Sequence, residues 1–329
     1  MAEKGTRNGI GLRAVTLAAV GLSMALSGCA TGHAEPTGAD KEFWVNPDSR
    51  AAREVRRVAA QGRDSEAELL GRIAEQPVAE WIDQTPGERA RAVTERAAVA
   101  GRTPVLVAYH IPYRDCGNHS AGGAEDSTEY RNWIRELAGG IGDRQAIVVL
   151  EPDAVAQTVD GCVPPQLRAE RMALLRDATR TISRLPRAKV YLDAGNAGWI
   201  KDPEPLAAAL RKSGIAHADG FSLNVANFQP TDRTRRYGHR LSQALGGVHF
   251  VIDTSRNGKG PVGGDEGHWC NPPGRALGER PSTRTGDALV DAYLWIKRPG
   301  ESDGRCNGGP QAGTWWSRYA LELARNAER

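Results

Sequence analysis

Two aspartates follow two neighbouring apolar runs in the middle of this sequence. Val105–Ile111 leads into Asp115, within RDCG, and Ala146–Leu150 leads into Asp153, within EPD. A pair of carboxylates held close together can act as an acid and a partner that tunes its pKa, because like charges at short range do not both ionise cheaply. The pair therefore predicts acid–base chemistry at one place in the fold.

The residues between the two apolar runs indicate how the aspartates come together. Tyr130, Trp133, Ile134 and Leu137 recur at helical spacing, so the pattern predicts strand, loop, helix and strand. In a parallel α/β unit both strands point their carboxyl ends the same way, to the edge where such folds keep their chemistry. Both aspartates are therefore expected on one rim of the sheet.

The same alternation of strands and helices continues along the chain. Strands are predicted at Val78–Ile82, Val105–Ile111, Ala146–Leu150, Lys189–Leu192, Gly220–Val225, His249–Ile252 and Leu289–Ile296. Helices are predicted at Gly87–Ala100, Gln166–Leu185, Glu204–Lys212, Thr231–Leu245 and Arg318–Asn326. Seven strands separated mostly by helices favour a parallel α/β barrel or a large doubly wound sheet.

Polar or aromatic residues follow nearly every predicted strand. They are Trp81, Asp115, Asp153, Asp193, Asn224, Asp253 and Asp303. Carboxylates that line one rim repel each other, so a structural protein gains nothing from them, and the pattern favours an enzyme. The net charge of +3 on 329 residues, with no basic block, argues against a nucleic-acid binder. Eight Trp against four Phe fit either sugar stacking or ordinary core packing.

The N-terminal residues have the features of an export signal. Lys4, Arg7 and Arg13 precede an apolar run, Ala14–Leu26, that is too short to span a bilayer comfortably. Leu26-Ser27-Gly28-Cys29 resembles a bacterial lipoprotein cleavage box, although an ordinary secretory signal is the alternative. We expect a signal peptide over 1–28, lipidation at Cys29, a tether over 29–40 and the folded domain over 41–329, exported to the extracellular face of the cell membrane or secreted.

Four further cysteines support export. Cys116, Cys162, Cys270 and Cys306 make an even number, which predicts two disulfides with three possible pairings. Cys116–Cys162 and Cys270–Cys306 would each close a loop at the rim and stabilise the fold by about 3–4 kcal/mol in the loop-entropy model. The cysteine spacings fit no zinc pattern, so no metal site is expected.

Six segments together resemble a known family. YHIPYRDCGNHSAGG, VVLEPD, YLDAGNAGW, VIDTSRNG, HWCNPPGRALG and LWIKRPGESDG, in this order across residues 105–304, resemble glycoside hydrolase family 6, the inverting β-1,4-glucanases. The resemblance implies a distorted seven-stranded parallel β/α barrel that hydrolyses β-1,4-glucan by single displacement without a cofactor. A monomer is expected.

The resemblance also assigns roles to catalytic residues. Asp153 matches the general acid that protonates the departing glycosidic oxygen, and Asp115 matches the carboxylate that holds the proton of this acid and raises its pKa. Asp303 matches the proposed base, or the acceptor that stabilises positive charge on the sugar. Tyr109 matches a tyrosine that crowds the sugar and favours its distortion.

Substrate contacts are assigned in the same way. Lys297 and Glu301 match contacts to sugar hydroxyls, and Asp193 matches an aspartate on the cleft floor. Trp81, Trp199 and Trp269 match platforms for glucose rings. Asn224, at a strand end, is assigned to substrate binding with them.

Several of these residues have simpler interpretations. Asp153 can be a helix N-cap, and Arg114 and Asp115 can form a local ion pair. Asp253 and Arg256 are expected to brace the rim through charge-assisted hydrogen bonds. His119 is expected to be a loop histidine, and Trp133 and Trp295 core residues.

The sequence departs from the family pattern at one position. Ala121 stands where the family has a serine that helps to relay the proton of the attacking water, although Ser120 adjoins it. His110 is a smaller departure. A lipid-anchored glucan-binding protein with weak or no catalysis is therefore an alternative.

Loop lengths bear on the mode of cleavage. Only 22 residues separate Gly274 from Lys297, and only 13 separate Cys116 from Tyr130, which is short for loops that roof a tunnel. An open cleft favours internal cleavage over cellobiohydrolase-type action at chain ends. No separate cellulose-binding module is expected.

Overall fold

The computed structural model describes residues 42–263 and 269–327. The predicted signal peptide 1–28, the lipidation site Cys29 and the tether 29–40 lie outside the described residues. Within the described part, no helix is long and apolar enough to cross a membrane.

The described residues contain one sheet of seven parallel strands, ordered as in the sequence. The strands are β1 (Glu80–Ile82), β2 (Val105–Ala108), β3 (Ala146–Leu150), β4 (Ala188–Asp193), β5 (Gly220–Leu223), β6 (His249–Asp253) and β7 (Val290–Leu294). Near-continuous apolar runs such as AIVVL in β3 are typical of strands that are covered on both faces. Each predicted strand is therefore confirmed, with small shifts at its ends.

The first and last strands meet at a narrow seam. Just before β1, Val78 pairs with Trp295 in a single parallel bridge, and the amide of Ala79 donates to the Trp295 carbonyl over 2.9 Å. Farther along, Nε1 of Trp81 donates to the carbonyl of Ile296 over 2.8 Å. The sheet is thus curled into a distorted barrel whose last junction has few hydrogen bonds, which confirms the predicted fold class.

Alternate residues of the strands face opposite sides of the curled sheet. Val105, Val107 and Tyr109 pack with Val149 and Val251 inside it. The intervening residues pack with the helices in a separate, larger cluster that includes Leu106, Ala108, Val148 and Leu150. This period of two follows from strand geometry and brings Tyr109, which continues the inward row, to the carboxyl edge.

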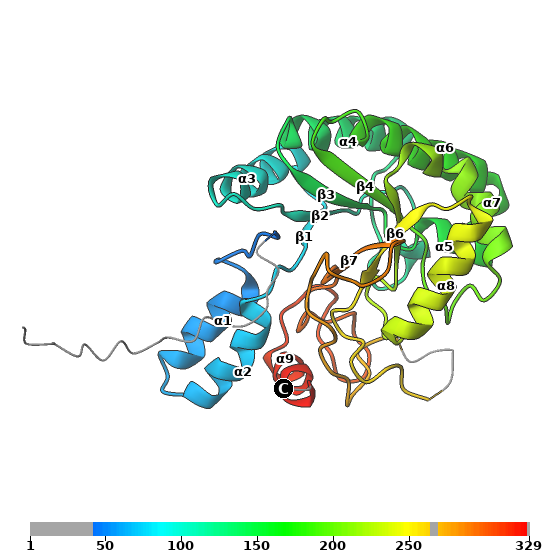
Figure 1. Ribbon diagram of the computed structural model, residues 1–329. Coiled ribbons are helices and arrows are strands. Elements are labelled where there is room, and N and C mark those ends of the chain that lie inside the picture. The colour runs from blue at the N-terminus through cyan, green and yellow to red at the C-terminus, as the bar shows by residue number, and fades with distance from the viewer. Residues whose placement is uncertain (1–41, 264–268, 328–329) are drawn as a thin grey trace, which may run out of the picture. The chain divides into compact units, whose positions relative to one another are not determined.

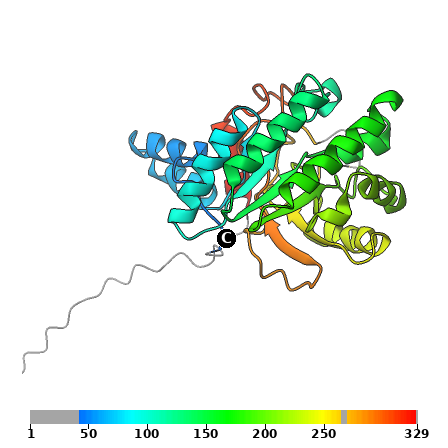
Figure 2. The same ribbon diagram turned by 90° about the horizontal axis from the view of Figure 1, so that it is seen from above.

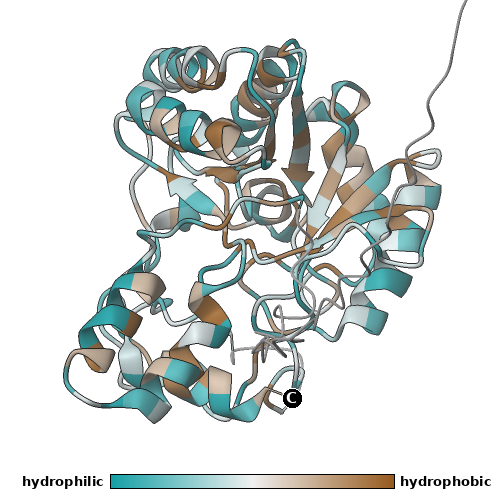
Figure 3. Cartoon of the chain, turned by 60° about the vertical axis from the view of Figure 1, so that its left-hand side comes forward, coloured by the Kyte–Doolittle hydropathy of each residue, from teal (hydrophilic) through white to brown (hydrophobic). Residues whose placement is uncertain are grey.

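Helices cover the outer face of the sheet, as Figures 1 and 2 show. They are α3 (Pro86–Val99), α4 (Ser127–Ile141), α5 (Ala154–Asp160), α6 (Pro165–Ile182), α7 (Pro203–Lys212) and α8 (Thr231–Ala244), with short 3₁₀ turns η1 (Asp115–Gly117) and η2 (Ile215–His217). Figure 3 shows apolar strands beneath helices whose solvent-facing sides are hydrophilic. The helices begin at local signals: the side chain of Asp126 caps α4, and that of Asp202 caps α7.

Three more helices pack together beside the seam. They are α1 (Arg50–Ala59), α2 (Asp64–Ala74) and α9 (Ser317–Asn326). Leu70, Ile73 and Leu323 enclose Trp295, which is 2% exposed and is confirmed as a core residue. The sequence analysis predicted α9 but not α1 or α2, because the charge-rich sequence RAAREVRRVA hides a narrow apolar face.

Candidate active site

A cleft of about 910 Å³ opens at the carboxyl ends of the strands. A volume of this size suits a small-molecule or oligomer site. Nine of the residues that the sequence assigned to the site line it: Trp81, Tyr109, Asp115, Asp153, Trp199, Trp269, Lys297, Glu301 and Asp303. The fold therefore brings together side chains from segments as far apart as β1 and the residues after β7.

Asp153 lies between β3 and α5, with a left-handed backbone of φ +71°. Its side chain makes no capping hydrogen bond to α5, so the N-cap interpretation does not describe it. Burial raises the pKa of Asp153 well above its usual value, and the negative charges of Asp193 and Asp115 raise it further, in that order. A carboxyl group with a raised pKa holds its proton to a higher pH than usual and can donate it to substrate.

Asp193, at the end of β4, lies beneath the cleft rather than in its wall. Its Oδ2 accepts hydrogen bonds from the amides of Asp153, at 2.8 Å, and Gly195, at 3.0 Å, and its Oδ1 accepts one from the hydroxyl of Ser222, at 2.9 Å. Burial raises the pKa of Asp193 to about 6, against the lowering effect of these donors. After burial, the negative charge of Asp193 is therefore the largest contribution to the raised pKa of Asp153.

Asp115 belongs to the turn η1, in the loop after β2. Its Oδ2 accepts the Ser120 amide at 2.8 Å, and its Oδ1 accepts Nε2 of Gln157 at 3.4 Å. Burial is the main cause that raises the pKa of Asp115. No ion pair joins it to Arg114 among the described side chains; Arg114 instead donates to the carbonyls of Tyr109, at 2.6 Å, Ser120, at 2.8 Å, and Ala121. Arg114 thus holds the loop backbone in place without forming an ion pair with the Asp115 carboxylate.

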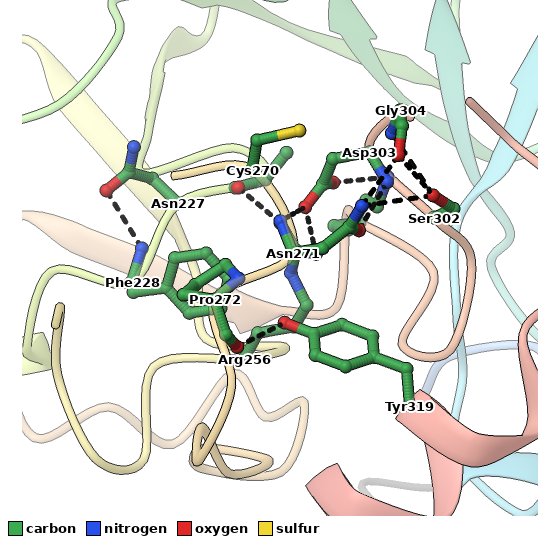
Figure 4. A network of polar contacts seen from close by, with 12 residues as sticks. Asn227, Phe228, Arg256, Cys270, Asn271, Pro272, Ser302, Asp303, Gly304 and Tyr319 are labelled. Carbon is green, nitrogen blue, oxygen red and sulfur yellow. Dashed lines mark hydrogen bonds and ion pairs between the residues drawn. The ribbon is translucent and has the colours of Figure 1, made fainter. Parts of the chain in front are cut away.

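Asp303 has the opposite electrostatic environment. Its Oδ2 accepts Nη1 of Arg256 at 2.8 Å and the amide of Asn271 at 3.0 Å, and its Oδ1 lies 2.9 Å from Nζ of Lys297. Figure 4 shows Asp303 held between Arg256 and Asn271. Burial alone would raise the pKa of Asp303, but the two cations outweigh it and lower that pKa to about 2. Asp303 is therefore ionised at any ordinary pH.

Each disulfide lies beside one of these carboxylates. Cys116, next to Asp115, is bonded to Cys162, with their Cα atoms 6.2 Å apart. Cys270 is bonded to Cys306, with Cα atoms 6.1 Å apart, and the following residue, Asn271, holds Asp303. The structure thus contains the two pairings that would close loops at the rim.

Aromatic side chains form the other walls of the cleft. The rings of Trp81 and Tyr109 meet edge to face, with centroids 5.2 Å apart, and the guanidinium of Arg114 lies 4.6 Å from the Tyr109 centroid. Nε1 of Trp199 donates to Asp160 over 2.8 Å, whereas Trp269 is 44% exposed. Trp81, Trp199 and Trp269 thus each place an aromatic ring in the lining of the cleft.

Comparisons with known proteins agree with this geometry. The family profile described as Glycosyl hydrolases family 6 matches residues 38–327. The chain belongs to this family. It is 47% identical to Endoglucanase A of Cellulomonas fimi, over 87% of this chain and 61% of that protein, and 42% identical to Endoglucanase A of Thermobispora bispora, over 88% and 63%. The chain therefore spans less than two thirds of the length of these two relatives.

A shorter relative and a solved structure match nearly from end to end. Endoglucanase 1 of Streptomyces halstedii is 40% identical over 95% of this chain and 97% of that protein. The endoglucanase Cel6 of Mycobacterium tuberculosis superimposes with a TM-score of 0.82 at 46% identity, over 88% of this chain and 98% of that one. That structure holds methyl-cellobiosyl-4-deoxy-4-thio-β-D-cellobioside.

Two of the predicted substrate contacts in this family 6 cleft have protein partners. Lys297 pairs with Asp303, as described, while it also lines the cleft. Glu301, 3% exposed, lies 2.9 Å from Nε of Arg298 and 3.4 Å from Nη1 of Arg50. Both residues are thus oriented before a sugar arrives.

Asn224 does not line the cleft. It follows β5 with φ +68° and is fully buried. Its side-chain amide donates to the Asp253 carbonyl over 2.9 Å, and its oxygen accepts the amide of Gln229 over 3.0 Å. The structure therefore places Asn224 under the rim as a backbone support, whereas Asn227 and Gln229, which the sequence analysis did not select, line the cleft.

Asp253 braces the rim, as the sequence analysis expected. Burial raises its pKa, although its carboxylate accepts the amides of Ala226, at 3.0 Å, Ser255, at 2.9 Å, and Lys297, at 2.9 Å. Arg256 does more than brace the rim, because this buried cation lowers the pKa of Asp303. The sequence analysis missed Asn271, although its position in the motif HWCNPPG was a signal.

Glu151, in the EPD motif, is another residue with a role beneath the cleft. It is fully buried, and its carboxylate accepts the amides of His110, at 3.0 Å, and Ile111, at 3.1 Å. Burial raises the pKa of Glu151 to about 7. It fixes the backbone that follows Tyr109. His110 itself turns away to stack on Trp133, with ring centroids 5.0 Å apart.

Ser120 and Ala121 both line the cleft. Ala121 has a methyl group where the resemblance places the relay serine. The hydroxyl of Ser120 is one residue away, and the amide of Ser120 already contacts Asp115. His119 lies in the same loop and meets the ring of Trp269 at 5.9 Å, edge to face.

Proposed function

We propose that this chain hydrolyses internal β-1,4-glucosidic bonds of cellulose or a related β-glucan by an inverting, single-displacement mechanism. The contrast between two carboxyl groups in one cleft carries the proposal. The pKa of Asp153 is raised, so that it keeps a proton, and the pKa of Asp303 is lowered to about 2, so that it stays charged. Two carboxyl groups whose pKa values are pushed apart are typical of glycoside hydrolysis.

The first step is protonation of the departing oxygen. Asp153 donates its proton to the glycosidic oxygen as the bond to the anomeric carbon breaks. Positive charge then develops on the sugar ring, and the fixed negative charge of Asp303 stabilises it at little reorganisation cost. Tyr109 packs against the ring at this subsite, which favours a distorted sugar.

A water attacks the opposite face of the anomeric carbon and must lose a proton. Asp303 is a poor acceptor for it, because a carboxyl group with a pKa of about 2 binds protons weakly. Asp115, whose pKa is raised, is the better acceptor. Since Ser120 adjoins Asp115 in the cleft, we assign the relay of this proton to a water held near Ser120.

Internal cleavage is supported by the short loops around the cleft and by the relatives named endoglucanases at 40–47% identity. Trp81, Trp199 and Trp269 are proposed to stack on successive glucose rings. A relative named 1,4-beta-D-glucan cellobiohydrolase CEL6A, from Pyricularia oryzae, is 31% identical. The identities therefore favour action along the chain over action at its ends.

We also propose that the protein is exported and held at the outer face of the cell membrane by a lipid on Cys29. The basic residues before Ala14–Leu26 and the box Leu26-Ser27-Gly28-Cys29 support this assignment. The catalytic domain is proposed to act as a monomer.

The deciding experiment incubates the purified protein with carboxymethylcellulose and measures the viscosity and the number of reducing ends over time. The expected result is a fast fall in viscosity with few new reducing ends, and its loss in Asp153→Ala. Slow viscosity loss with many soluble ends would replace internal cleavage by chain-end cleavage. Binding without any release of reducing ends, from this or other β-glucans, would select the glucan-binding alternative.

A further inference from the structure

Gln157 connects the helix that follows the proposed acid with the proposed proton acceptor. It lies in α5, one turn after Asp153, and its backbone amide donates to the Asp153 carbonyl over 2.8 Å. Its side chain is 5% exposed and lines the cleft, where Nε2 donates to Oδ1 of Asp115 over 3.4 Å. The mechanism described above gives Gln157 no role.

A buried arginine lies on the other side of Gln157. Arg171, in α6, is 4% exposed and is not among the described residues that line the cleft. Its Nη1 donates to Oε1 of Gln157 over 3.3 Å, and its Nη2 donates to the carbonyls of Pro112, at 2.9 Å, and Tyr113, at 2.7 Å. Arg171 thus holds both Gln157 and the loop that leads to Asp115.

Donor and acceptor chemistry fixes the orientation of the Gln157 side-chain amide. A guanidinium group only donates hydrogen bonds, so Arg171 bonds to the oxygen end of the Gln157 side chain and not to its nitrogen end. The nitrogen end then points the other way, toward Asp115. A donor at this place favours the ionised form of the Asp115 carboxyl group, whereas a reversed amide would present an oxygen and favour the protonated form.

We propose that Arg171 and Gln157 are positioning residues that hold Asp115 as an ionised acceptor for the proton of the attacking water. This inference rests on the proposed function, in which Asp115 takes that proton. Arg171 acts through Gln157, and Gln157 acts through Asp115. Both hydrogen bonds lie at the long end of the usual range, as those around catalytic groups often do before substrate binds.

Other groups also influence the charge of Asp115. The charged and titratable groups that interact with it are Tyr109, Arg114, His119 and Asp153. Burial is the largest cause of the raised pKa of Asp115, and the hydrogen bond from Gln157 lowers that pKa against it. Variants of Gln157 leave these four groups in place, so a shift of the Asp115 pKa in such variants reports the lost hydrogen bond.

The test is the acidic limb of kcat/KM against pH for the full chain on cellopentaose, a substrate without ionisable groups. The acceptor must be ionised, so activity falls as pH drops through the pKa of Asp115 in the free enzyme. Gln157→Met removes the donor at similar side-chain size, and Gln157→Glu replaces it by a carboxyl group. Gln166→Met, at an exposed position of α6, is the matched control.

Gln157→Met is expected to move the acidic limb up by about one pH unit, near the lower end of what a hydrogen bond to a charged group contributes. Gln157→Glu moves it further, because a second negative charge then faces Asp115, and the control keeps the original profile. An unmoved limb in both Gln157 variants, with Asp115→Asn inactive, would overturn this inference alone. Full activity of Asp115→Asn would overturn the proposed role of Asp115 as well.

The part of Arg171 is tested by its dependence on Gln157. Arg171→Met loses the bonds to the Pro112 and Tyr113 carbonyls, so the melting temperature falls whichever residue stands at position 157. The acidic limb is expected to move up in the original background, because the freed amide can reverse, and to move little in the Gln157→Met background. Equal limb shifts in the two backgrounds would show that Arg171 acts by its charge alone and would overturn its assignment as a positioning residue.

Discussion

Nη1 of Arg256 donates to Oδ2 of Asp303 over 2.8 Å, and both side chains are almost completely buried. The Arg256 guanidinium also lies 4.4 Å from the ring centroid of Phe228. An ion pair buried this deeply is costly to break, because removing Arg256 leaves the buried Asp303 carboxylate with Lys297 in place of two cations. The pair therefore links the charge that catalysis needs to the stability of the fold.

We expect Arg256→Met to lower the free energy of unfolding by about 3–5 kcal/mol, as loss of one partner of a buried pair does. Arg256→Met/Asp303→Asn is expected to recover part of this loss, because the buried carboxylate is gone and only Lys297, which is partly exposed, loses an ionic partner. Urea denaturation of both variants measures the difference. Equal losses in the two variants would show that packing of Arg256 against Phe228, rather than its charge, carries the effect.

Asp193→Asn is expected to change the pH dependence of hydrolysis. Asp153 acts only when protonated, so activity falls as pH rises through its pKa. The variant removes the largest of the three negative charges that raise this pKa, so the pKa falls and the alkaline limb of the kcat profile moves to lower pH. Profiles of kcat against pH measure the shift. Asp115→Asn is expected to shift this limb less, and it also lowers kcat itself because Asp115 is the proposed acceptor of the water's proton.

Glu151 predicts a pH dependence of stability. Its pKa is about 7 in the folded chain and about 4.3 when unfolded, so the folded state binds the extra proton. Stability therefore falls as pH rises from about 4 to about 7, by about 3 kcal/mol for this group. Glu151→Gln keeps one acceptor oxygen for the amides of His110 and Ile111 but cannot ionise. We expect its unfolding free energy to vary less over this range than that of the original chain, and parallel curves would refute the assignment.

Ala121 offers a gain-of-function test. If the proton relay runs near Ser120, then Ser120→Ala lowers kcat on carboxymethylcellulose by about a hundredfold or more, within the range typical of assisted proton transfer. Ala121→Ser is expected to restore activity in that background. Initial rates with KM determined separately will show whether the change lies in kcat. Full activity of Ser120→Ala would contradict the role of Ser120 and indicate that backbone carbonyls of the loop hold the relay water instead.

The sequence predicted the strands of the sheet but not the residues at which β2 and β7 end. The apolar run Val105–Ile111 predicts a strand to its last residue, yet β2 ends at Ala108, since the amides of His110 and Ile111 bond to Glu151 instead of a neighbouring strand. β7 ends at Leu294 in a similar way, because the Lys297 amide bonds to Asp253.

Polar side chains that bond to the backbone at strand ends also explain why Asn224 was wrongly predicted to contact substrate. A polar residue after a strand either faces the cleft or turns back to hold backbone, and the spacing is the same in both cases. Asp153 does the first and Asn224 the second. The positive φ of each allows the turn but does not decide its direction, so only the three-dimensional contacts separate a ligand contact from a support.

We expect glucan binding to reduce local unfolding at the seam between β1 and β7. Trp81 is both a wall of the cleft and the donor of the hydrogen bond that reaches Ile296 across the seam. Because few hydrogen bonds close this junction, we expect the free energy of local opening to be lower here than elsewhere in the barrel. A glucan that stacks on Trp81 binds only the closed form, so it lowers the population of the open form. Amide hydrogen exchange at Val78–Ile82 should therefore slow when the cleft is occupied, so the junction reports on the substrate.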